Sequence, residues 1–311
     1  MVEIDKDVKI DSTNLRFKFS IIVVAAVLPR ACGIYAQNLF VANEYGNDVI
    51  EITPGGVQNI FASGLGIPWA VAFDSAGDLF VANWASATII EITPGGVKST
   101  FASESYFGLG GLAINRAGNV FVSNNQNGDI YEITPSGTQS TFASGLTPDG
   151  LAFNGAGDLF VANTIGGNII EITPGGTQST FASGLSYPTA VAFDNAGDLF
   201  VACESSGIIT EITLGGVKST FASGLNTPYG LAFNSAGDLF ESDWGSGKIY
   251  EFTPGGVQST FASGLDGPIG LAFQPVPEPS AVVLLFVGAV SLLCAAKRQS
   301  GNACNRFKPT R

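Results

Sequence analysis

Five large aromatic side chains occupy positions at which the copies of an internal repeat differ from one another. They are Tyr45, Trp69, Trp84, Tyr229 and Trp244, and they include all three tryptophans of the chain. Aromatic residues with a polar group favour binding surfaces, and their faces stack on the apolar faces of sugar rings. We therefore expect these five residues to form a ligand-binding platform. The alternative is that the rings fill the mouth of a channel and pack against neighbouring structure.

Four acidic residues in the same variable segments offer a second kind of chemistry. They are Glu44, Asp149, Glu204 and Asp243. A calcium-dependent hydrolase would need about three or four oxygen ligands that converge on one ion. The chain contains no histidine, which removes the usual general base and the Ser–His and Cys–His nucleophile systems. We therefore assign no catalytic residue and expect no cofactor, and a calcium-dependent hydrolase stands as the alternative function.

A repeat of about 40 residues positions these side chains. A Leu-Phe or Val-Phe pair begins at Leu39, Leu79, Val120, Leu159, Leu199 and Leu239, so successive copies are 39 to 41 residues apart. Each copy holds four short segments rich in Val, Ile, Phe and Thr, separated by turn-forming residues. Four antiparallel strands at a fixed period are typical of the blade of a β-propeller. The sequence predicts an all-β fold in which residues 37–275 form a six-bladed propeller with four antiparallel strands in each blade.

The two ends of the repeat region predict how the ring closes. The first copy lacks its first strand and begins at residues 38–43, whereas the last copy ends with a spare first strand at residues 270–274. We expect the spare strand to complete the first blade, because this pairing leaves no open strand edge at the seam. The copies that carry the five aromatic residues then become neighbours in the ring.

The turns of each copy divide into a uniform set and a divergent set. The uniform turns read Asx-x-Ala-Gly-Asx, as at 74–78, or Thr-Pro-Gly-Gly, as at Thr53, and we expect them to be structural rather than calcium-binding. An asparagine ends the second strand in four copies and is expected to cap the loop that follows it. These residues are Asn43, Asn83, Asn124 and Asn163. Cys203 replaces the asparagine in another copy and is expected to be a buried thiol.

The repeat region is strongly acidic. Residues 37–275 contain 21 Asp and Glu against four Lys and Arg, a net charge of −17, whereas the whole chain has −12. Such a field repels nucleic acid and anionic polymers and suits neutral or cationic ligands. The same charge is explained more simply as a means of keeping the protein soluble. It therefore argues against nucleic acid and anionic polymers as partners but does not identify a ligand.

One segment of the repeat carries a family resemblance. Residues 230–240 read Gly-Leu-Ala-Phe-Asn-Ser-Ala-Gly-Asp-Leu-Phe, which resembles the NHL repeat of six-bladed propellers. The pattern is also similar to the wider group that holds the SMP-30/gluconolactonase lactonases and the virginiamycin B lyases. The resemblance implies the propeller fold, and the lactonases imply calcium held by acidic and amide side chains as the alternative. The lyases are known for a catalytic histidine, which this chain lacks.

The two terminal segments are predicted to direct export rather than to fold with the propeller. Residues 1–36 place Arg16 and Lys18 before an apolar run at 19–28, as a signal peptide does. Within residues 276–311, a Pro-Glu-Pro motif precedes an apolar run at 281–296 and a basic end; these residues are Pro277, Glu278, Pro279, Lys297 and Arg298. This order resembles the PEP-CTERM sorting signal of Gram-negative bacteria.

The resemblance at the C-terminus implies handling by exosortase-type machinery and an envelope or matrix rich in exopolysaccharide. The run at 281–296 would make a helix of ~24 Å, just short of the ~30 Å hydrocarbon core of a bilayer. We expect it to enter the membrane before processing, with its basic end in the cytoplasm and the propeller outside.

Together these features predict an exported binding or scaffold module of the cell envelope or extracellular matrix. We expect its divergent face to recognise a neutral glycan, so its partners would be an extracellular polysaccharide or an envelope protein. Nucleic acid is not expected as a partner, because of the acidic field. The alternative is a calcium-dependent hydrolase or lactonase.

Overall fold

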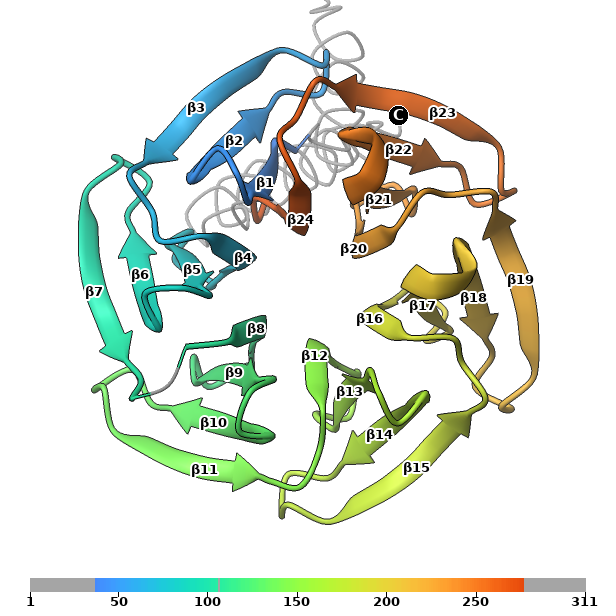
Figure 1. Ribbon diagram of the computed structural model, residues 1–311, viewed down its shortest axis with the longest axis horizontal. Helices are drawn as coiled ribbons and strands as arrows, with labels where there is room; N and C mark the ends of the chain where they lie inside the picture. Colours follow the sequence, from blue (N-terminus) through green and yellow to red (C-terminus); the bar gives the residue numbers. More distant parts are fainter. Residues whose placement is uncertain (1–36, 106, 277–311) are drawn as a thin grey trace, which may run out of the picture. The chain divides into compact units, whose positions relative to one another are not determined.

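The computed structural model describes residues 37–105 and 107–276, which form a six-bladed β-propeller (Figure 1). Each blade is one sheet of four antiparallel strands, so the predicted fold is confirmed. The predicted signal peptide and the predicted Pro-Glu-Pro motif, membrane helix and basic end lie outside the described residues. Within the described ranges, no helix has the length and apolar character that crossing a membrane requires.

The strands of each blade run outward from the centre of the ring in the same order. The innermost strands are β24 (Pro268–Phe273), β4 (Pro68–Phe73), β8 (Leu109–Ile114), β12 (Pro148–Phe153), β16 (Pro188–Phe193) and β20 (Pro228–Phe233). The second strands are β1 (Leu39–Asn43), β5 (Leu79–Asn83), β9 (Val120–Asn124), β13 (Leu159–Asn163), β17 (Leu199–Cys203) and β21 (Leu239–Asp243). The third strands are β2 (Asp48–Ile52), β6 (Thr88–Ile92), β10 (Asp129–Ile133), β14 (Asn168–Ile172), β18 (Ile208–Ile212) and β22 (Lys248–Phe252). The outermost strands are β3 (Gln58–Ser63), β7 (Lys98–Ser103), β11 (Gln139–Ala143), β15 (Gln178–Ser183), β19 (Lys218–Ser223) and β23 (Gln258–Ser263), and two short 3₁₀ turns are η1 (Glu204–Ser206) and η2 (Trp244–Ser246).

The hydrophobic core lies between neighbouring blades. The second strand β1 is buried along its whole length, because blades cover both faces of its sheet. Its Phe40 makes edge-to-face contacts at 4.9 Å between ring centroids, with Phe61 in the same blade and with Phe73 in the next. The same arrangement recurs around Phe160 in β13. Repetition of one apolar pattern therefore builds six similar cores between blades, and Ile114 takes the place of the second phenylalanine in the core that contains Phe80.

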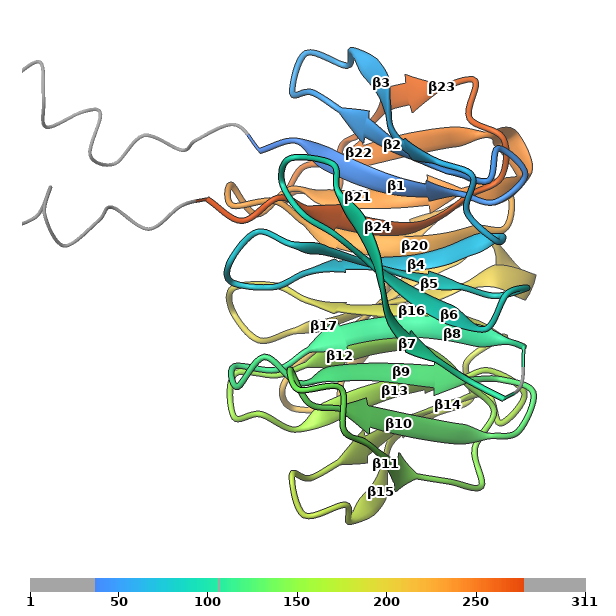
Figure 2. The same cartoon turned by 90° about the vertical axis from the view of Figure 1, so that its left-hand side faces the viewer.

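The ring closes as predicted, with the last strand completing the first blade. β24 pairs antiparallel with β1, so that Leu39 lies opposite Phe273 and Val41 opposite Leu271. The pairing continues beyond the strands, where the Gln274 amide donates to the Asn38 carbonyl at 3.0 Å. The closing strand begins two residues earlier than the predicted 270–274, at Pro268. The described ends of the chain thus lie together on one side of the ring (Figure 2).

The uniform turns are structural, as expected. They join the first to the second and the third to the fourth strand of each blade, and we call this side of the ring the turn face. In the first of them, Asp74 Oδ1 accepts hydrogen bonds from the amides of Ala76 and Asp78, both at 2.9 Å. Gly77 has φ +88°, a conformation that glycine adopts without penalty. These carboxylate oxygens are therefore used within the turn.

The asparagines at the ends of the second strands were predicted to cap the following loop, and the backbone bonds of their side chains show this in one of the four blades. Asn124 behaves as predicted, since its Oδ1 accepts from the amides of Gln126 and Asn127 in that loop. In three other blades the Oδ1 accepts instead from the connection that enters the same blade; these residues are Asn43, Asn83 and Asn163. The side chain thus ties together the two kinds of loop on the side of the ring opposite the turn face, which we call the loop face. Cys203 is a buried free thiol, as predicted.

One core position departs from the repeat. Glu241 in β21 stands where the other five second strands have valine, between Leu231 and Tyr250 on the neighbouring strands. Its side chain is 0% exposed, and neither carboxyl oxygen has a hydrogen-bond partner among the described residues. Burial raises the pKa of Glu241 well above its ordinary value, and the charge of Asp243 adds to the shift. Burial therefore favours the neutral form of this carboxyl group.

Candidate functional site

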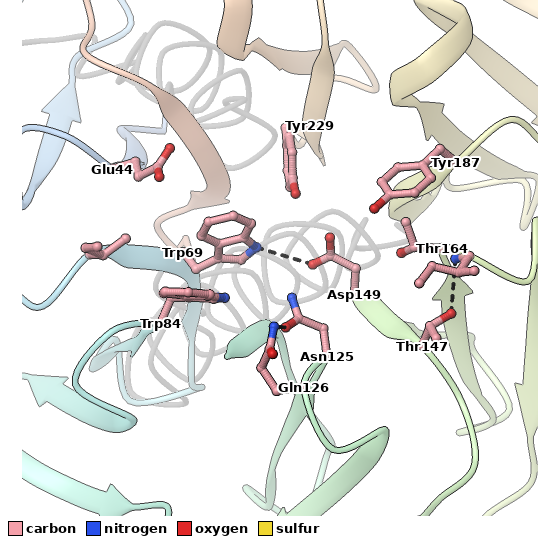
Figure 3. A pocket seen from close by; sticks show the side chains of 12 residues that line it. Glu44, Trp69, Trp84, Asn125, Gln126, Thr147, Asp149, Thr164, Tyr187 and Tyr229 are labelled. Atoms are coloured by element: carbon pink, nitrogen blue, oxygen red, sulfur yellow. Dashed lines mark hydrogen bonds between the residues drawn. The ribbon is translucent and has the colours of Figure 1, made fainter. Parts of the chain in front are cut away.

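A pocket of about 410 Å³ opens on the loop face, where the innermost strands begin (Figure 3). All six blades contribute to it, through the innermost strands, the loops after the second strands and the connections between blades. The lining residues are Glu44, Ile67, Trp69, Trp84, Asn125, Gln126, Thr147, Asp149, Thr164, Ile165, Tyr187 and Tyr229. We call this the central pocket. Its lining comes from the segments in which the repeat copies diverge.

Three of the five aromatic residues proposed as a platform line the central pocket. Trp69 on β4 packs edge-to-face against Tyr229 on β20, with ring centroids 5.4 Å apart. Trp69 also lies 6.2 Å from Trp84, which follows β5. Trp84 in turn contacts Phe107, whose side chain is 52% exposed. The rings are half-buried, so part of each aromatic surface remains open to the pocket.

The other two aromatic residues form a separate pair beside the pocket. Tyr45 and Trp244 lie 6.0 Å apart, and neither lines the central pocket. The Trp244 Nε1 donates to Glu44 Oε2 at 2.7 Å. This bond joins η2 to the loop after β1, across the seam at which the ring closes. The predicted platform of five residues is therefore divided into a pocket group of three and a seam pair of two.

Asp149, at the start of β12, lies deepest among the charged groups of the pocket. Only 6% of the residue is exposed, and Oδ1 accepts a hydrogen bond from Trp69 Nε1 at 3.3 Å (Figure 3). Burial raises the pKa of Asp149 to about 7, and the charge of Glu204 adds to the shift. Hydrogen bonds from Trp69 and Tyr229 act in the opposite direction. About half of the molecules therefore carry the Asp149 charge at neutral pH.

The other acidic candidates have different tasks. Asp243 accepts from the amides of Asn226 and Ser246, at 2.7 and 3.1 Å, and so takes the place of the asparagine in the other blades. Glu44 lines the pocket but is bound to Trp244, and Glu204 begins η1. Over residues 37–105 and 107–276 no group of three or more Asp, Glu, Cys or His is placed to hold a metal ion. The convergence that the calcium-dependent alternative needs is thus not found in this part of the chain.

Two residues of the pocket lining have a strained backbone. Ile67 and Tyr187, both of which line it, have φ values of +57° and +58°. Each immediately precedes the proline that opens an innermost strand, and Thr227 has φ +63° at the equivalent position. A β-branched residue in the left-handed region is a genuine outlier, and each such residue costs on the order of 1–3 kcal/mol. Strain of this kind collects at binding sites.

Sequence reasoning missed several residues of the pocket. Tyr187, Ile67 and Thr147 lie in the connections between blades, whose copies were not compared residue by residue. The same comparison that isolated the tryptophans would have found them, because the residue before the opening of the innermost strand also differs among the six copies. Thr164 was likewise missed; it is 8% exposed, and its Oγ1 has no hydrogen-bond partner among the described residues.

Comparison with known proteins supports the fold. No family model and no curated protein matches the sequence. A solved propeller in the nidogen/laminin complex is 16% identical, with a TM-score of 0.71 over 78% of this chain and 100% of that chain. Virginiamycin B lyase from Staphylococcus aureus is 19% identical, with a TM-score of 0.56 over 67% of this chain and 77% of that chain. A protein of unknown function from Bacteroides caccae is 17% identical, with a TM-score of 0.62 over 78% of this chain and 100% of that chain. At these identities the likeness is one of fold.

Proposed function

We propose that the protein is an exported binding module whose central pocket takes a ring-shaped ligand without negative charge, in particular a sugar unit of an envelope or matrix polysaccharide. The observation that carries this proposal is the pocket itself, which gathers Trp69, Trp84 and Tyr229 from two blades on either side of the seam. Its volume of about 410 Å³ lies in the range of small-molecule sites. The seam pair, Tyr45 and Trp244, extends the aromatic surface beside it.

The chemistry of the lining suits a sugar better than a purely apolar ligand. Aromatic faces supply apolar contact, and side-chain amides and hydroxyls surround them, at Asn125, Gln126, Thr147 and Thr164. No basic residue lines the pocket, which disfavours an anionic ligand.

Export and sorting are proposed from the terminal segments. The Pro-Glu-Pro motif, apolar run and basic end resemble a PEP-CTERM signal. The described ends of the chain, near Gln37 and Gln274, lie on the turn face. A propeller tethered through its C-terminus would therefore present the central pocket away from the tether.

Enzyme activity finds less support. The catalytically inactive form of virginiamycin B lyase carries a change of histidine to alanine, and this chain has no histidine. A lactonase of the calcium-dependent kind would need a convergent set of oxygen ligands. We therefore propose binding rather than catalysis.

Tryptophan fluorescence and calorimetry with a panel of oligosaccharides test the proposal. Two of the three tryptophans line the pocket, so binding is expected to change the emission of the wild type and of Trp244→Phe alike. Trp84→Ala is expected to weaken binding by ~2 kcal/mol, about thirtyfold in Kd, with a smaller effect on thermal stability. A loss of ~3–5 kcal/mol of stability with no ligand found would identify the rings as packing residues instead.

Sorting is tested by fractionation of the native host. A chain that lacks residues 276–311 is expected to appear in the medium in soluble form, whereas the full chain stays with the envelope. Identical fractionation of the two chains would contradict the sorting proposal.

A further inference from the structure

We propose that the central pocket binds an organic ammonium group, held between the Asp149 carboxylate and the aromatic rings of Trp69, Trp84 and Tyr229. This inference rests on the proposed function and narrows it: the ligand carries a positive charge, as a protonated amino sugar or a quaternary ammonium compound does. It concerns the same pocket and names the group that the pocket selects.

The first support is a buried negative charge without a cation. Asp149 is 6% exposed, and its carboxyl group accepts hydrogen bonds from Trp69 and Tyr229. A buried charge is costly unless an opposite charge pairs with it. A cation that enters the pocket would therefore supply the opposite charge that Asp149 lacks. None of the four basic residues in the described part of the chain lines the pocket. Two of them, Lys98 and Lys218, instead donate to carbonyl groups of neighbouring outer strands.

The second support is the combination of aromatic faces with acidic groups. A cation over an aromatic ring is attracted by the electron-rich face, and the attraction grows when water is excluded. Tyr229 shows how closely the acids surround the rings, because after burial the charges of Asp149, Glu204 and Glu44 all raise its pKa. A neutral sugar would use the rings but would leave this negative field unused.

The third support is the spacing of the acidic groups. A compact metal ion needs several oxygen atoms at about 2.3–2.6 Å, and the described carboxylates do not form such a set. An organic ammonium group needs only one carboxylate and the aromatic faces around it.

The ionisation of Asp149 gives the interaction a characteristic pH dependence. With a pKa of about 7, Asp149 is mostly neutral at pH 6 and mostly charged at pH 8. The groups that face it are Trp69 on β4, Tyr229 on β20 and Glu204 in η1, while Glu44 and Tyr187 act on Tyr229. Tetramethylammonium keeps its charge at every pH, so its affinity reports the protein groups alone. We expect it to bind about tenfold more weakly at pH 6 than at pH 8.

Calorimetry on the full chain, in an uncharged polyoxyethylene detergent that contains neither sugar nor ammonium, makes the test. The probes are tetramethylammonium, glucosamine oligomers with free amines, and the same oligomers in N-acetylated form. We expect the free amines to bind at least tenfold more tightly than the N-acetylated oligomers, and Asp149→Asn to remove this preference. Glu211→Gln removes one negative charge near the turn face and is expected to bind as the wild type does.

The outcomes separate the two proposals. Equal affinity for free and N-acetylated oligomers, unchanged in Asp149→Asn, would overturn the ammonium inference and leave the binding module intact. Binding of tetramethylammonium with no binding of either oligomer would support the ammonium site and overturn the sugar ligand. No binding of any probe by the wild type would overturn both. The wild-type comparison of probes holds even if Asp149→Asn fails to fold.

Discussion

The turn face and the loop face both use the left-handed backbone conformation, but only the loop face also gives it to residues other than glycine. On the turn face, every described residue with positive φ is a glycine, for example Gly77, Gly96 and Gly118. The non-glycine residues with positive φ all lie on the loop face; they are Asn47, Ile67, Ala87, Tyr187 and Thr227. Glycine adopts this conformation at little steric cost, whereas Ile and Thr do not. Strain is thus confined to the face that holds the central pocket.

The difference shows what repetition within one chain reveals about function. On the turn face the six copies agree, and their polar side chains are used in local turns, as Asp74 is. On the loop face the copies disagree, and several side chains point into the pocket, as Trp69 and Asp149 do (Figure 3). A residue that does the same task in every blade is structural, whereas a residue unique to one blade needs a separate reason. The comparison of the two faces therefore points to the candidate site from this one sequence.

The largest expected effect comes from opening the ring, which should destabilise the whole propeller and therefore both of its faces. Deletion of β24, Pro268–Phe273, removes the innermost strand of the first blade and exposes β1 on one edge. Because an unpaired strand edge recruits other chains, we expect the variant to aggregate. We also expect its unfolding to lose cooperativity. Thermal denaturation and size-exclusion chromatography measure the result. A monomeric variant with wild-type stability would show that the two faces do not depend on closure.

The second effect concerns the core behind both faces, where Glu241 is the exception. Glu241→Val restores the residue of the other five blades and removes a buried carboxyl group without partners. We expect the free energy of unfolding to rise by roughly 2 kcal/mol at neutral pH. The folded state holds the Glu241 proton above the ordinary pKa of 4.5, so wild-type stability falls as pH rises from there towards the folded pKa.

The gain from Glu241→Val is therefore expected to increase with pH across that window. Urea unfolding at several pH values measures it, with Glu241→Gln as the control that keeps a polar group but cannot ionise. The glutamine variant is expected to lose the pH dependence without the full gain in stability. A wild type and a valine variant of equal stability at every pH would mean that the carboxyl group is satisfied in a way the described residues do not reveal.

Much of the fold was predictable because one pattern is repeated six times. The spacing of the Leu-Phe pairs and the turn residues fixed the strand count, and the spare strand predicted the closure. The start of this strand was predicted two residues late, at Gly270 rather than Pro268, because the Gly-Leu-x-x-Pro pattern was interpreted as a turn that includes the proline. Proline is tolerated at the first residue of a strand, where the missing N–H breaks no ladder bond.

The site was less predictable, because it depends on how unlike loops meet across the ring. Divergence among the copies pointed to Trp69, Trp84 and Tyr229, but not to the separation of Tyr45 and Trp244 from them. That separation depends on the 3₁₀ turn η2 and the bond from Trp244 to Glu44, which are particular to two blades. Glu241 was open to the same comparison, since valine stands at this position in the other five copies.

The smallest and sharpest effect is a pair of substitutions with opposite signs on the two faces. Gly77→Ala on the turn face places a Cβ at φ +88°, with only ordinary contact to Pro94 at 3.8 Å. We expect a loss of roughly 1–2 kcal/mol from backbone strain alone, and no change in ligand binding. Ile67→Gly on the loop face relieves a residue at φ +57°. After the entropy cost of glycine, we expect a gain in stability of roughly 0.5–1 kcal/mol.

Ile67→Gly should also weaken ligand binding, because it removes part of the pocket wall and lets the connection before β4 move. Ile67→Ala is the matched control: it removes the same wall, but its Cβ keeps most of the left-handed strain, so it should lose binding without the full gain in stability. Denaturant unfolding and calorimetry on the three variants separate strain from contact. If Ile67→Gly is instead less stable than the wild type, the left-handed backbone of Ile67 is not strained. The two faces would then differ in sequence but not in backbone strain energy.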